Sequence, residues 1–127
     1  MTALGAFNTQ LIRFFEELVS SYPEERDIKM GLEAIQGAKK INPKLILDLF
    51  GEHVYADLHT YIKTEDEDYV LKYAHSKIKN EFNEMSVALI ILDKYWTTMT
   101  DGNQKAIWNY LKVLCILYEK AKATRGF

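Results

Sequence analysis

Hydrophobic residues recur at helical spacing along almost the whole chain. In the first segment they step by three and four residues, at Phe7, Leu11, Phe14, Leu18 and Tyr22. This is the period of one face of an α-helix. Pro23 ends the segment, because the residue before a proline resists the α conformation. Strand-like alternation is hard to find, and only two prolines and six glycines interrupt the sequence, so the pattern predicts an all-α protein.

Turn and capping residues divide this periodicity into separate helices. Ser21-Tyr22-Pro23-Glu24 and Thr64-Glu65-Asp66-Glu67 both have the spacing of a capping box, which predicts helix starts after Ser21 and near Asp66. Asn42-Pro43 predicts a start at residue 43, because asparagine caps helices and proline suits the first helical position. The helix from residue 43 should continue through Leu58 to residue 62, since its apolar positions keep the helical period.

The second half of the chain contains the most apolar helix. Residues 85–98 are apolar on nearly all sides, so we expect them to be central. A break near residues 80–84 separates them from the preceding helix, and one bent rod is the alternative. Thr100-Asp101-Gly102-Asn103-Gln104 is a turn in which Asp101 caps the last helix. We expect a compact single-domain bundle of residues 1–127, ordered at about 7–122, with five or six helices, short connections and a core built from the last two.

Composition and charge agree with one globular domain. The 127 residues are 48% hydrophobic and 27% charged, and 16 Lys+Arg against 18 Asp+Glu give a net charge of −2. This balance makes nucleic acid the less favoured partner.

The single cysteine, Cys115, lies in the apolar run VLCILY and is expected to be a buried hydrophobe. MTALGAFNTQ is not a signal peptide, and the longest apolar runs have six residues, so we expect a soluble cytoplasmic protein with no membrane partner.

The stretch GEHVYADLHTYIKTEDED (51–68) contains two histidines and several carboxylates, so it is a candidate metal or acid–base site. On a helix, His53 and Asp57 share a face, but His59 lies about 240° from His53 at 100° per residue. The sequence lacks the zinc-binding motif His-Glu-x-x-His, and the spacing gives no reason for His75 to bind a metal together with His53 or His59. We expect structural or surface histidines. A metal site or a pH-sensitive contact are the alternatives.

Other chemical motifs are missing from the sequence. The acidic run at 64–68 has neither the glycine nor the glutamate that an EF-hand requires, and its charges suit a helix start. No nucleophile elbow or glycine-rich phosphate loop is present. We therefore expect no catalytic residue, no metal ligand and no cofactor, with an unrecognised metal-dependent enzyme as the alternative.

Lysines gather at two places along the chain and are the candidate contacts for nucleic acid or for a partner. Three bracket the Asn-Pro turn, and further basic residues accumulate towards the end: Lys39, Lys40 and Lys44, then Lys120, Lys122 and Arg125. Part of this accumulation is what the C-terminal end of a helix prefers. Only three arginines are present, although arginine is the usual phosphate clamp.

Parts of the chain resemble a group of viral proteins. NPKLILDLF (42–50), the spaced Val54, Leu58 and Ile62, and WTTMTDGNQKAIWNYL (96–111) are similar to small uncharacterised helical proteins of large nucleocytoplasmic DNA viruses. The resemblance covers roughly residues 7–120. It implies expression in an infected cell's cytoplasm and a role in virion assembly, at the replication site or on a host protein. It assigns no functional residues.

These observations lead to a non-enzymatic helical module for protein interaction or assembly. Its protein partner is unidentified, and self-association into a homo-oligomer is open. The alternative is a nucleic-acid-associated accessory factor that uses the Lys39, Lys40 and Lys44 turn together with the C-terminal lysines.

Overall fold

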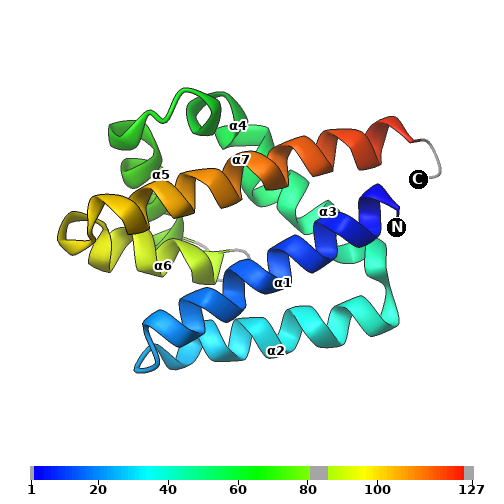
Figure 1. Cartoon of the computed structure of the whole chain (residues 1–127), viewed down its shortest axis with the longest axis horizontal. Helices are drawn as coiled ribbons and strands as arrows, with labels where there is room; N and C mark the ends of the chain where they lie inside the picture. The colour runs from blue at the N-terminus through cyan, green and yellow to red at the C-terminus, as the bar shows by residue number, and fades with distance from the viewer. Residues whose placement is uncertain (1, 81–85, 125–127) are drawn as a thin grey trace.

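The chain folds into a bundle of helices (Figure 1). The computed structural model describes the backbone of residues 2–80 and 86–124, and the side chains of 2–77 and 89–124. Over these residues the elements are α1 (Ala3–Ser21), α2 (Arg26–Ile41), α3 (Pro43–Phe50), the π-helical turn η1 (Gly51–Tyr55), α4 (Ala56–Lys63), α5 (Glu67–Asn80), α6 (Ser86–Tyr95), the 3₁₀ turn η2 (Trp96–Thr98) and α7 (Asp101–Ala123). Because α3, η1 and α4 run without interruption, the described residues form six rods. The predicted all-α bundle of five or six helices is confirmed.

The rods pack mainly around α1. α1 lies between α2 and α7, α5 pairs with α6, and α4 packs against α7 (Figure 1). The expectation that the last two helices build the core is therefore only partly right. α1 supplies Phe7, Leu11 and Phe15, which are buried together with Ile91 of α6 and Leu114 of α7. The predicted break near residues 80–84 falls mostly on 81–85, outside the described residues.

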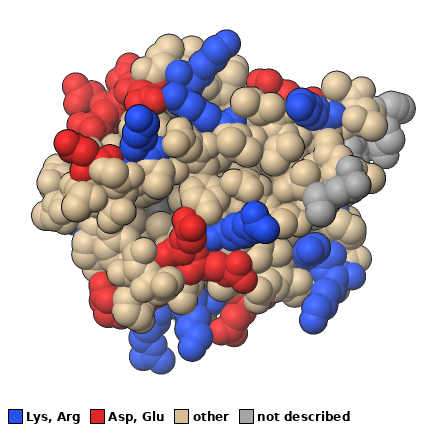
Figure 2. All heavy atoms as spheres, viewed as in Figure 1, with Lys and Arg blue, Asp and Glu red and all other residues tan. Residues whose placement is uncertain are grey.

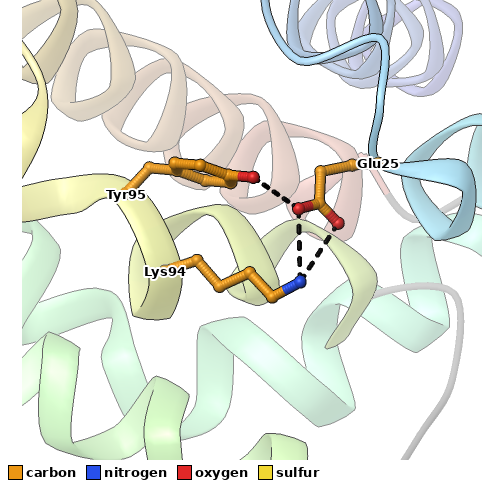
Figure 3. A network of polar contacts seen from close by, with 3 residues as sticks. All are labelled: Glu25, Lys94 and Tyr95. Carbon is orange, nitrogen blue, oxygen red and sulfur yellow. Dashed lines mark hydrogen bonds and ion pairs between the residues drawn. The ribbon is translucent and has the colours of Figure 1, made fainter.

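The start of α2 differs from the predicted capping. α2 begins at Arg26, and its N-cap Glu25 makes no side-chain hydrogen bond to the helix. Instead, the Glu25 carboxylate accepts hydrogen bonds from Tyr95 Oη (2.6 Å) and Lys94 Nζ (3.2 Å) at the end of α6 (Figure 3). The Ser21–Glu24 capping box is therefore wrong, because Ser21 is still the last residue of α1 and α2 begins only at Arg26.

The other predicted caps are close to the observed ones. Asn42 caps α3 by accepting from the Lys44 backbone N–H, as predicted. α5 starts at Glu67, and Asp66 Oδ1 accepts from the Tyr69 backbone N–H. α7 is capped by Thr100, one residue before the predicted Asp101.

The long third rod contains a π-helical turn that the periodicity does not predict. The backbone N–H of Ala56 donates to the Gly51 carbonyl, five residues back. Within this turn the His53 carbonyl accepts a hydrogen bond from Tyr73 Oη (2.9 Å), which also lies 3.0 Å from Asp57 Oδ2. The His53 carbonyl and the Asp57 carboxylate thus both anchor Tyr73 of α5. No helix among the described residues is both long and apolar enough to cross a membrane.

Candidate functional site: a groove between α4 and α7

A groove runs between α4 and α7. Its volume is about 540 Å³. Apolar atoms of Ile62, Cys115 and Ile116 line it together with polar side chains of both helices: His59, Thr60, Lys63, Thr64, Lys112 and Glu119. We call this set of nine residues the α4–α7 groove. It combines an apolar base with polar groups, which is the usual make-up of a ligand or peptide site.

Two contacts with α7 mark the two ends of the groove. At one end Tyr55 Oη donates to Glu119 Oε2 at 2.5 Å. At the other end Lys112 Nζ pairs with the Glu65 carboxylate just beyond α4. Because the start of α4 meets the later part of α7, the two helices run antiparallel. The groove therefore has a carboxylate at one end and two lysines, Lys63 and Lys112, at the other.

The end of the groove near Glu119 is organised by an aromatic stack. The imidazole of His59 lies on the Tyr55 ring, with centroids 4.4 Å apart and planes 9° apart. His59 Nδ1–H donates to the Tyr55 carbonyl at 2.8 Å, so in the neutral ring Nε2 is an acceptor. The hydrogen bond to Glu119 is the main cause that raises the pKa of Tyr55 to about 12, with burial second. Tyr55 is a neutral phenol at physiological pH.

Cys115 in the groove is a protonated thiol. Burial, aided by the negative charge of Glu119, raises its pKa to about 12. Reactive cysteines have a lowered pKa and sit in electropositive surroundings. Cys115 has the opposite environment, so its contribution to the groove is apolar surface, as the sequence predicted for a buried hydrophobe.

The three histidines do not converge. His53 lies 4.0 Å from Glu52, His59 stacks on Tyr55, and His75 Nδ1 lies 2.9 Å from Asp93 Oδ1. In the described part of the chain, no group of three or more histidine, cysteine, aspartate or glutamate side chains could hold a metal ion.

The structure brings the predicted lysine contacts to one end of the molecule, away from the base of the groove. Lys39 and Lys40 are in the last turn of α2, Lys44 opens α3, and Lys120 and Lys122 are in the last turn of α7. Figure 1 shows these helix ends at the same end of the bundle, next to the start of α1. Arg125 lies outside the described residues. Blue side chains are visible at this end in Figure 2.

Sequence reasoning missed the groove itself. α7 is apolar around much of its circumference at residues 113–118, so the period could not separate the buried Leu114 and Cys115 from Ile116, which is 49% exposed. Only the position of α4 decides which side of α7 stays open. Comparisons with protein-family models, curated proteins and solved structures found no match to this chain.

Proposed function

We propose that this protein is a non-enzymatic protein-binding module that takes an amphipathic helix of a partner protein into the α4–α7 groove. The observation that carries the proposal is the exposed Ile116 beside Ile62 and Cys115 in a groove of about 540 Å³. Helix-in-groove recognition uses such an apolar base for anchors spaced at i, i+3 or i+4 and i+7. Val113, one turn before Ile116 on α7, is also exposed and extends the apolar surface.

The charges of the groove suggest the orientation of the bound helix. Glu119 lies at one end, and Lys63 and Lys112 lie at the other, with Glu65 offsetting part of their charge. A partner helix with a basic residue towards Glu119 and an acidic residue towards Lys63 would be complementary. Such charge pairs contribute more to specificity and association rate than to affinity.

A binding role is supported over catalysis by the state of the reactive groups. The Cys115 thiol is protonated at neutral pH, and His59 is held by its stack and backbone hydrogen bond. The cytoplasm of an infected cell, with a host or virion protein as partner, remains our proposal for the setting.

Site-specific photo-crosslinking tests the proposal. A photoactivatable amino acid at Thr60, in the groove, should capture a partner segment from a cell extract. The same group at Met30, which is 65% exposed on α2, is the matched control position. Mass spectrometry of the crosslinked peptide should give a sequence with helical apolar period.

A second substitution makes the test specific. Ile116→Asp places a charge in the apolar base and should abolish crosslinking from Thr60, whereas Met30→Asp should leave it unchanged. Equal capture at Thr60 and Met30, or capture at Thr60 that survives Ile116→Asp, would show that the groove is not the binding site.

A further inference from the structure

The turn between α2 and α3 carries apolar side chains that the core does not use. Ile41 is 88% exposed and Leu45 is 42% exposed. Ile41 follows Lys39 and Lys40, and Leu45 follows Lys44. We call these five residues the lysine corner. An aliphatic side chain held in water gains none of the free energy of burial, so the packing of the chain itself gives no reason for Ile41.

A hollow opens beside the lysine corner. It lies between α1 and α2, has a volume of about 530 Å³ and is lined by Ile12, Gln36, Lys39 and Lys40. Two ammonium groups and one amide can all donate hydrogen bonds to an anion. A phosphate group with an attached apolar chain matches this combination of donors and the aliphatic wall of Ile12.

The surrounding helix ends add positive charge. Lys120 and Lys122 lie in the last turn of α7, at the same end of the bundle (Figure 1). The first turns of α1 and α3, which also face this end, contain no acidic residue. Figure 2 shows blue side chains above and below at this end. Lysines at the ends of α2 and α7 and at the start of α3 therefore lie at the same end of the bundle as the exposed Ile41.

We propose that this end of the protein docks on the surface of an anionic membrane. Ile41 and Leu45 enter the boundary between headgroups and acyl chains, while the lysines contact lipid phosphates and carboxylates and the hollow receives one headgroup. Peripheral binding of this kind combines buried apolar area with attraction to anionic lipid. It requires no spanning helix, and it departs from the sequence expectation that a membrane is not a partner.

The exposed isoleucine favours a membrane over nucleic acid. The phosphate backbone of a nucleic acid has no apolar surface against which Ile41 could pack. The basic residues in the last turns of α2 and α7 are lysines, whereas nucleic-acid sites favour arginine and aromatic stacking. Each lysine near an anionic leaflet raises partitioning about fivefold, so a few lysines together with one inserted isoleucine give reversible, salt-sensitive binding.

Vesicle co-sedimentation of the full chain tests the proposal. The wild-type protein should sediment with vesicles of phosphatidylcholine and phosphatidylserine at low salt, and much less with phosphatidylcholine alone. Binding should fall as salt is added, because screening shortens the reach of charge from about 10 Å at 0.1 M to about 3 Å at 1 M. A mobility shift with duplex DNA is run in parallel.

Matched variants separate the two contributions. Ile41→Ser should reduce partitioning about tenfold, because the inserted side chain is lost. The double variant Lys39→Glu/Lys40→Glu should abolish binding to the vesicles. Met30→Ser and Lys105→Glu change exposed residues elsewhere and should leave binding unchanged. Absence of binding to phosphatidylserine vesicles, equal effects of test and control variants, or a shift of DNA without vesicle binding would overturn the proposal.

Discussion

Tyr118 lies directly against Gly51. A Cβ atom at residue 51 would stand 2.8 Å from Tyr118 Cζ, closer than non-bonded carbon atoms approach. Tyr118 belongs to α7 and Gly51 opens the π-helical turn η1, so the missing side chain lets the two rods meet. The ring of Tyr118 is enclosed by Phe50 and Tyr55, with centroids 6.0 Å and 4.4 Å away. Gly51 is therefore a packing requirement of the α7 contact.

We predict that Gly51→Ala destabilises the protein by about 1–3 kcal/mol, the usual cost of overpacking. Ala is otherwise the better helix former by about 1 kcal/mol, so a net loss can only come from the clash with Tyr118. Urea unfolding measures the change. In the background Tyr118→Leu the ring is absent, and Gly51→Ala should then cost little or stabilise.

Gly37 supplies the matched control. It lies inside α2, and a Cβ atom there would meet nothing within 4 Å. Gly37→Ala should therefore stabilise the protein by about 0.5–1 kcal/mol through helix propensity and reduced chain entropy. If both glycine substitutions changed stability equally, the contact with Tyr118 would not be what constrains residue 51.

Sequence periodicity predicted the parts of the fold that depend on local spacing. The stripe Phe7, Leu11, Phe14 and Leu18 is buried as expected, because a helix turns its residues predictably wherever it packs. The Asn42 cap was also predictable, since its hydrogen bond spans two residues. Local rules fix which face of a rod is apolar.

Features that depend on which rods meet were not predictable. The spacing explains Glu25 only as an acidic residue at a helix start, yet its carboxylate is bound by Tyr95, 70 residues away. The π-helical turn accompanies the contact of Tyr118 with Gly51, and the α4–α7 groove exists because α4 leaves Ile116 uncovered. The two lysine groups looked separate for the same reason. A single sequence gives no information on these long-range arrangements.

The hydrogen bond between Tyr95 and Glu25 should make stability depend on pH. The bond from Tyr95 is the largest cause that lowers the pKa of Glu25 below its ordinary 4.5, and Lys94 adds to it. A lowered pKa means that the carboxylate contributes stability above pH 4.5, which is lost as pH falls through the folded-state value. Tyr95→Phe should therefore lower stability at neutral pH and lose less on acidification to about pH 3.

Tyr22→Phe is the control for this pair. Tyr22 stacks on Tyr95 with centroids 4.5 Å apart, and its substitution keeps the bond to Glu25. Chemical unfolding of the three proteins at several pH values should give parallel wild-type and Tyr22→Phe curves and a flatter curve for Tyr95→Phe. Identical slopes for all three would exclude the Glu25 contact as a source of acid sensitivity.

Two neighbouring aliphatic residues of α7 should respond differently to truncation. Leu114 is completely buried, whereas Ile116 is 49% exposed in the groove. Leu114→Ala should cost about 2–5 kcal/mol, the range for a truncated core leucine, and Ile116→Ala less than about 1 kcal/mol. Thermal unfolding of the two variants measures both losses of stability. A large loss at Ile116 would mean that the groove is closed in solution and that its base belongs to the core.

Asn8 is the buried polar side chain of α1, and its chemistry predicts an unusual pH response. Its Nδ2 donates to the Pro43 carbonyl at 3.1 Å, and Oδ1 has no partner among the described residues. Asn8→Ala should cost about 1–3 kcal/mol through the lost hydrogen bond. Asn8→Asp should cost more at neutral pH, because a buried carboxylate is costly to desolvate and cannot donate to the Pro43 carbonyl.

Acidification should narrow the gap between these two variants. Burial raises the pKa of a carboxyl group in the folded state above its unfolded value of about 3.9. The destabilisation of Asn8→Asp relative to Asn8→Ala is therefore complete above the folded-state pKa and declines as pH falls and the carboxyl gains a donor proton. The unfolding free energies of both variants at neutral pH and at about pH 4 measure the difference. Glu25 is present in both variants, so its own titration cancels from the comparison. A gap that stays constant would mean that residue 8 reaches water, and that the bond to Pro43 does not anchor the start of α3 to α1.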